Sequence, residues 1–127
     1  MPRVFKAIDI EKEEKEVMRD YLDRHMPHVI CADQAKKGDK LTVKVRMGEE
    51  YTHPDDHDHY ISVIQLWNRE TLLAECRYSS GAFANKPAHS EVDFYLTAPE
   101  VSMNLTAMAV CTKHGLWQSE EKAVKVI

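Results

Sequence analysis

Hydrophobic and polar residues follow two different periods along this chain. Between residues 10 and 22 the apolar residues recur at helical spacing, and charged residues fill the positions between them. These apolar residues are Ile10, Val17, Met18, Tyr21 and Leu22. Asp9 directly precedes them and has a side chain suited to capping a helix. The pattern predicts one amphipathic helix over residues 10–22, with its mixed charges facing solvent.

After residue 27 the period changes to two. In residues 40–47 apolar side chains alternate with lysine, threonine and arginine, as on a strand with one buried face. Together with this segment, seven stretches are predicted as strands: residues 28–31, 40–47, 59–67, 71–78, 91–97, 104–111 and 122–127. Turn signals such as Lys37-Gly38-Asp39 separate them. We therefore expect an all-β fold, an immunoglobulin-like seven-stranded antiparallel β-sandwich with a short N-terminal helix.

Length, charge and cysteine count narrow the class of protein. A chain of 127 residues suits a single domain, 1–127, in which residues 1–24 form a helical extension. The net charge of −4 gives no general attraction to nucleic acid, and no apolar run of about 18 residues indicates a membrane span. The start lacks the pattern of a signal peptide, and the three cysteines include no C-x-x-C pair. We expect a cytoplasmic protein with reduced thiols, acting without nucleic acid or membrane.

Histidine and cysteine gather in two segments that resemble the halves of one metal site. The first runs from His53 to His59, just before a predicted strand, and the second from Cys111 to Trp117, just after another. Imidazoles and a thiolate favour zinc, copper or iron over calcium or magnesium. Because His59 opens one strand and Cys111 closes another, an antiparallel arrangement can bring the two ends together. The sequence therefore predicts a metal site in the loops at one end of the sandwich.

Three motifs in a fixed order carry a resemblance to a known family. They are Asp23-Arg24-His25-Met26-Pro27-His28-Val29-Ile30, His53-Pro54 with His59-Tyr60-Ile61, and Cys111-Thr112-Lys113-His114-Gly115-Leu116-Trp117. Over residues 23–118 they resemble the superoxide reductase family, the neelaredoxin and desulfoferrodoxin iron proteins. The lack of a four-cysteine N-terminal segment resembles the one-iron members, which have no desulforedoxin-like domain.

The resemblance implies a ligand set, a reaction and partners. It places one non-haem iron among four imidazoles and an axial thiolate, in a square-pyramidal ferrous site whose sixth position accepts superoxide. The implied ligands are His25, His53, His59 and His114, with Cys111 on the axis. Superoxide would be reduced by one electron to hydrogen peroxide, and a rubredoxin-like donor would return the iron to the ferrous state. The family also implies a homodimer or a homotetramer.

Two residues depart from the family pattern, which has Glu-Lys where this chain has Asp23-Arg24. The family's glutamate binds ferric iron, and its lysine attracts superoxide and orders water. Arg24 is predicted to steer superoxide but to be a poor proton donor, because its guanidinium does not titrate. Asp23 is one methylene shorter than glutamate, so its reach to the iron is an open alternative. Lys113 and His57 are further candidate cations beside the ligand positions.

Other classes of protein remain open from the residues alone. The same ligands could hold zinc in a structural or interaction domain, although structural zinc prefers four ligands and would leave one histidine spare. An electron-transfer protein without a substrate would need its sixth position blocked. Outside the motifs, His28 and His89 are interpreted as surface or structural residues. Trp117 is expected to form a wall that shields the site from water.

Overall fold

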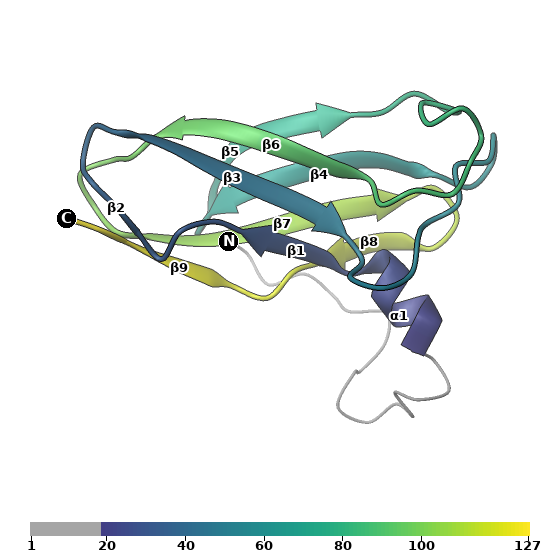
Figure 1. The fold of residues 1–127 in the computed structure, drawn as a ribbon, viewed down its shortest axis with the longest axis horizontal. Coiled ribbons are helices and arrows are strands. Elements are labelled where there is room, and N and C mark those ends of the chain that lie inside the picture. The colour runs from purple at the N-terminus through teal and green to yellow at the C-terminus, as the bar shows by residue number, and fades with distance from the viewer. Residues whose placement is uncertain (1–18) are drawn as a thin grey trace.

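The computed structural model describes residues 19–127, which form one short helix and nine strands (Figure 1). The elements are α1 (Arg19–His25), β1 (Pro27–Ile30), β2 (Gln34–Ala35), β3 (Lys40–Met47), β4 (Ile61–Asn68), β5 (Thr71–Arg77), β6 (Glu91–Thr97), β7 (Met103–Cys111), β8 (Gly115–Gln118) and β9 (Lys122–Val126). Among these residues no helix is long and apolar enough to cross a bilayer.

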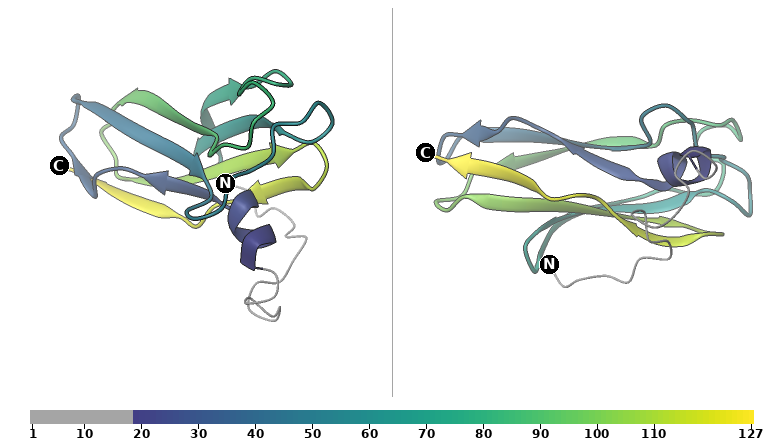
Figure 2. Two further views of the ribbon diagram at one scale, coloured as in Figure 1. Left: turned by 45° about the vertical axis from the view of Figure 1, so that its right-hand side comes forward. Right: turned by 90° about the horizontal axis from the view of Figure 1, so that it is seen from below.

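Two sheets face each other as layers, with α1 at one end (Figures 1 and 2). One sheet has the order β1-β3-β6, and the other has the order β2-β9-β7-β4-β5, with β8 also pairing β7. The predicted all-β sandwich is confirmed, and all seven predicted strands are present with ends shifted by one or two residues in most cases. The very short β2 and β8 are additional. One departure from the antiparallel expectation is that β2 pairs β9 in parallel.

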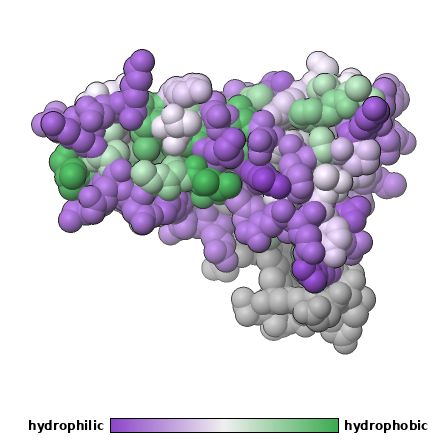
Figure 3. All heavy atoms as spheres, viewed as in Figure 1, coloured by the Kyte–Doolittle hydropathy of each residue, from purple (hydrophilic) through white to green (hydrophobic). Residues whose placement is uncertain are grey.

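The core lies between the layers and follows the period-two pattern. On β3 the alternate residues Leu41, Val43, Val45 and Met47 are buried. They pack with apolar side chains of the opposite sheet, such as Leu66 on β4. Strand β7, which lies between β9 and β4 in its sheet, is buried along most of its length. The outer surface is mostly hydrophilic with scattered apolar patches, as Figure 3 shows for one face.

Helix α1 ends where the chain enters the first sheet. Residues 10–18 of the predicted helix and most of the proposed 1–24 extension lie outside the described residues. The helix runs past the predicted end at residue 22 and stops at His25, because Met26 precedes Pro27 and is disfavoured in a helical conformation. Leu22 and His25 are three positions apart on one face, and both are buried. The helix therefore presents its last residue to the interior.

A bulge distorts the sheet next to Cys111. On β4, Ile61 pairs with Cys111 and Val63 pairs with Val110, so Ser62 is an extra residue on its strand. Such bulges bend a strand and re-aim neighbouring side chains, and they are frequent beside functional sites. The bend lies at the start of β4, two residues after His59, and at the end of β7. It therefore helps to bring the two predicted ligand segments to the same end of the sandwich.

Candidate metal centre

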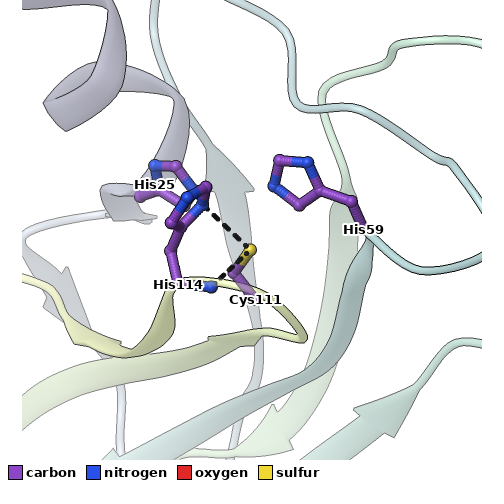
Figure 4. A group of neighbouring side chains, drawn as sticks. All are labelled: His25, His59, Cys111 and His114. Atoms are coloured by element: carbon purple, nitrogen blue, oxygen red, sulfur yellow. Dashed lines mark hydrogen bonds between the residues drawn. The ribbon is translucent and has the colours of Figure 1, made fainter.

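Four separate parts of the fold place imidazole and thiol groups at one end of the sandwich (Figure 4). His25 ends α1, and His53 and His59 lie in the loop between β3 and β4. Cys111 is the last residue of β7, and His114 lies in the turn before β8. One donor atom from each of His25, His59, Cys111 and His114 lies within 4.8 Å of all the others. His53 is outside that group of four but adjoins it.

The four imidazole rings stand at the corners of a square. The ring centroids of His25–His53, His53–His59, His59–His114 and His114–His25 are each 4.9 Å apart. Neighbouring rings are nearly perpendicular, at 76° to 85°. Across the diagonal, the His25 and His59 centroids are 6.4 Å apart. This arrangement gives four nitrogen donors a common centre.

Backbone carbonyls fix which nitrogen of two of the rings faces that centre. The Tyr21 carbonyl lies 2.6 Å from His25 Nδ1, and the Pro54 carbonyl lies 2.7 Å from His53 Nδ1. These contacts suit a protonated Nδ1 and leave Nε2 free as a donor to a metal. The His114 ring differs, because its Nδ1 faces the centre and lies 3.2 Å from His25 Nε2.

Two of the inward nitrogens have no hydrogen-bond partner. His53 Nε2 and His59 Nε2 are buried, and no described residue bonds to either. Buried polar atoms are normally satisfied, so such atoms call for an unseen partner. A metal ion of the kind that accepts imidazole nitrogen and sulfur would satisfy both, and iron, zinc and copper belong to that class. The residues present therefore fit a bound transition metal.

Cys111 supplies the sulfur atom of the cluster. Its side chain is buried, and its Sγ is 3.8 Å from His114 Nδ1. The backbone N–H of His114 donates to the same sulfur at 3.3 Å. Burial raises the pKa of the Cys111 thiol, while backbone N–H groups of Lys113 and His114 act in the opposite direction. Those donors would stabilise a thiolate once a metal displaces the proton.

Burial keeps the central histidines neutral. Loss of hydration lowers the pKa of His25 and that of His53 to about 4. The pKa of His59 is lowered for the same main reason, with a smaller contribution from the charge of His114. A neutral imidazole is the form that binds a metal. The cluster is thus ready to bind at neutral pH.

The loop that carries His53 is tied to distant parts of the chain. His53 forms a two-bond bridge with Ala88, with N···O distances of 2.9 and 3.0 Å. Two residues further on, the buried Asp55 carboxylate accepts the N–H groups of Phe83 at 2.8 Å and Asn85 at 3.1 Å. These bonds hold the loop against the segment between β5 and β6.

Two aromatic side chains pack against the imidazoles. The Trp117 ring stacks on His25 at 5.0 Å and 18°, and its Nε1 donates to the His114 carbonyl at 3.2 Å. Tyr21 meets the His114 ring edge-on at 5.2 Å. The sequence predicted a wall role for Trp117 but gave Tyr21 only a place on the helix face. Its spacing of four residues before His25 on a helix was the available signal.

The remaining predicted residues take up different positions. Arg24 pairs with Asp20 at 3.2 Å, and its charge is close enough to lower the pKa of His53 after the larger effect of burial. The charge of Lys113 acts on His59 and Cys111 in the same secondary way. His57 is exposed and contacts Ser80 instead. Asp23 turns both carboxylate oxygens to the backbone of residues 49–51.

Fold and site together define a β-sandwich protein with a cluster of imidazole and thiol groups able to bind a metal ion. A sequence model of the desulfoferrodoxin family matches residues 10–120, and the chain belongs to that family. The superoxide reductase of Thermococcus kodakarensis is 32% identical over 96 residues, 73% of this chain and 84% of the relative. That of Pyrococcus furiosus is 27% identical over 105 residues, 73% of this chain and 85% of the relative.

A solved structure supports the same fold. The superoxide reductase (neelaredoxin) of Ignicoccus hospitalis superposes with a TM-score of 0.70 at 25% identity. The match covers 92% of this chain and 89% of that protein. This chain is therefore similar to a single-domain neelaredoxin over nearly its whole length.

Proposed function

We propose that this protein is a superoxide reductase that converts superoxide to hydrogen peroxide. The observation that carries the proposal is the square of imidazole rings, 4.9 Å on each side, beside the buried sulfur of Cys111. His25, His53, His59, His114 and Cys111 would hold one iron ion. When bound, the iron supplies the single electron that, with two protons, turns superoxide into hydrogen peroxide.

The four histidines set the charge of the site. Because the pKa of His25 and that of His53 lie at about 4, these rings are neutral at physiological pH and bind metal without adding charge. Four neutral ligands and one thiolate leave a ferrous site with net positive charge, which attracts an anion. The carbonyls of Tyr21 and Pro54 keep the Nε2 atoms of His25 and His53 directed inward, so the donor set is prearranged.

Cys111 tunes the site electronically. As a thiolate, Cys111 would donate electron density to a bound iron, and this would favour transfer of an electron to superoxide. The N–H group of His114 stabilises the negative sulfur by a charge-assisted hydrogen bond. The burial of Cys111 keeps water and oxidants away from the sulfur.

Two cations would guide superoxide to the site. The charge of Arg24 acts on His53, and that of Lys113 acts on His59, so the two cations influence different members of the imidazole square. Arg24 attracts the anion but does not give up its proton. Protons for the product therefore come from water.

Three further features belong to the proposal. A small rubredoxin-like protein would re-reduce the iron after each turnover. The enzyme would act in the cytoplasm, where its free thiols Cys31 and Cys76 stay reduced. It would assemble as a homodimer or a homotetramer.

Metal analysis with stoichiometric product measurement tests the proposal. We expect about one iron per chain, a visible sulfur-to-iron charge-transfer band in the ferric form, and one hydrogen peroxide for each superoxide consumed by the reduced protein. Zinc-substituted protein is the control and should be colourless and inactive. Zinc in the native protein would favour a structural domain. Evolution of oxygen would indicate dismutation of superoxide. An iron spectrum that changes with neither superoxide nor azide would indicate electron transfer only.

A further inference from the structure

Both oxygens of the Asp23 carboxylate accept hydrogen bonds from the backbone of the loop after β3. Its Oδ1 accepts the N–H of Glu49 at 3.1 Å. Its Oδ2 accepts the N–H groups of Glu50 at 3.0 Å and Tyr51 at 2.7 Å. Three consecutive N–H groups around one carboxylate form an anion-binding concavity of the kind that phosphates occupy elsewhere. Here the anion is a side chain of the same protein.

The backbone around this contact is shaped to admit the carboxylate. Gly48 has a φ of +74°, and its N–H donates to the Met26 carbonyl at 2.9 Å. A Cβ at Gly48 would lie 2.6 Å from the Tyr51 carbonyl oxygen and 3.1 Å from the Asp23 carbonyl oxygen. Only glycine fits this conformation and this close approach without strain. The helix end and the loop are therefore joined by both side-chain and backbone contacts.

The contact connects the helix that carries His25 to the loop that carries His53. Tyr51, which is held at its N–H, lies two residues before His53, and its ring faces the Arg24 guanidinium at 6.0 Å. Arg24 is next to Asp23 in the helix and also donates to the Asp20 carbonyl at 3.0 Å. Loss of the Asp23 contact would thus free the loop before His53 and the aromatic face beside Arg24.

The surroundings of Asp23 differ from those of the metal centre. Burial tends to raise the pKa of Asp23, but the three N–H groups outweigh it, and the pKa is lowered with a further contribution from His28. The charges that act on His25 come from His53, His114 and His59. Asp23 is therefore placed by its hydrogen bonds to the loop amides.

We propose that Asp23 is a positioning residue that clamps the residue 48–51 turn to α1 and does not bind the iron. This inference rests on the proposed function, since it concerns the residue that corresponds to the family's ferric ligand. With both of its oxygens bonded to the loop, Asp23 would not supply a ligand to a bound ferric ion. Asp23 acts on the reaction through the placement of His53 and Arg24.

Amide hydrogen exchange of the purified full-length protein, with its native metal bound, tests the clamp. In Asp23→Ala we expect the amides of Glu49, Glu50 and Tyr51 to exchange at least ~10-fold faster, because each loses a charge-assisted acceptor. Asp23→Asn keeps one oxygen and should fall between Asp23→Ala and the parent. Asp58→Ala, an exposed acid later in the loop between β3 and β4, should leave these amides unchanged. Unchanged exchange in both Asp23 variants would overturn the clamp.

Gly48→Ala provides a second route to the same result if Asp23→Ala does not fold. It leaves the carboxylate in place but opposes the close approach of the turn, so the same three amides should exchange faster. These readouts follow the backbone and do not depend on which metal is bound. Their failure is thus distinct from failure of the superoxide reductase proposal, which would appear as absence of iron or of its reaction with superoxide.

The ferric spectrum of the iron-loaded protein tests the second half of the inference. In Asp23→Asn the charge-transfer band should keep its position, and azide affinity should stay within about twofold of the parent, because no ligand has been lost. A shifted band with azide bound ~10-fold more tightly would show that the carboxylate competes for the iron. That result would overturn the claim that Asp23 is not a ligand.

Discussion

The two halves of the metal centre are built in opposite ways. Cys111 and His114 belong to one tight turn between β7 and β8, where the His114 N–H donates to the Cys111 sulfur at 3.3 Å. His53 and His59 lie on a long loop that is held by residues far away in the sequence. Its bridge to Ala88 spans 35 positions, and the bond from Phe83 to Asp55 spans 28.

The two halves differ in whether local or long-range contacts hold their side chains in place. A short hairpin turn fixes Cys111 and His114 with little loss of chain entropy, and Gly115 supplies the positive φ of +84° that the turn needs. In the long loop, Asp56 and His59 exchange two local backbone hydrogen bonds of 2.9 and 3.1 Å, whereas His53 is held by its bridge to Ala88. The hairpin half is thus a local structure, and the loop half depends on tertiary contacts at His53.

Replacement of Cys111 removes the chemistry of the hairpin half and has the largest expected effect. In Cys111→Ser the sulfur-to-iron charge-transfer band should disappear and the rate with superoxide should fall by more than ~100-fold, beyond the ~10–100-fold cost of losing an outer partner of a ligand. Visible spectroscopy and pulse-radiolysis rates measure both.

A matched thiol provides the control. Cys76→Ser changes a half-buried free cysteine on β5 and should leave the band and the rate in place. Persistence of both signals in Cys111→Ser would show that another donor occupies the axial role. In that case the hairpin would contribute only His114.

Acid should destabilise the metal-free protein through the buried histidines on α1 and the loop. The pKa of His25 and that of His53 drop from 6.5 to about 4 on folding, so between these values the unfolded chain binds more protons. The free energy of unfolding should therefore fall as pH falls from 6.5 towards 4. At a pH where a histidine is protonated in the unfolded chain and neutral in the folded protein, it changes the free energy of unfolding by about 1.4 kcal/mol per pH unit.

Urea unfolding at several pH values after removal of the metal measures this slope. The exposed His57 supplies a control, since His57→Gln should leave the slope unchanged. A free energy that is flat between pH 6.5 and 4.5 would mean that His25 and His53 are both hydrated without metal. The end of α1 and the loop half would then be open until the metal binds.

The sequence predicted most of the sheet framework because burial leaves a periodic signal. The alternation over residues 40–47 corresponds to β3, where Leu41, Val43, Val45 and Met47 are buried. Strand β2 has two residues and β8 has four, too few to show any alternation. The parallel contact of Gln34 with Lys125 joins residues at opposite ends of the described chain, and no local pattern reports such a pairing.

The candidate site was likewise predictable only where it leaves a local pattern in the sequence. The five residues predicted as ligands stand in short motifs, and the structure brings all of them to one end of the sandwich. The contacts that place the loop half left no pattern, because Asp23 and Asp55 bond to backbone N–H groups 26 to 30 positions away. A carboxylate that binds backbone amides looks in sequence like any other acidic residue.

Removal of the Asp55 carboxylate should loosen the loop half without touching a donor. Asp55→Ala leaves the N–H groups of Phe83 and Asn85 without their acceptor inside the protein. A buried donor left unsatisfied costs about 1–3 kcal/mol, so thermal stability and iron retention should both decline. Asp58→Ala, an exposed acid in the same loop, should change stability by less than ~0.5 kcal/mol. Equal stability of the two variants would mean that the loop is not held through Asp55.

The smallest effect is expected for the charge of Arg24, which lies on α1 next to His25. Arg24→Ala should slow the reaction with superoxide by roughly threefold at low salt, and the difference should shrink as salt screens the charge. Arg24→Lys keeps the charge and should recover most of the rate. Lys125→Ala removes a cation from β9, the strand whose C-terminal end lies opposite α1 in Figure 1, and should have no such effect. A rate in Arg24→Ala that matches the parent at low salt would assign steering to Lys113, and hence to the hairpin half.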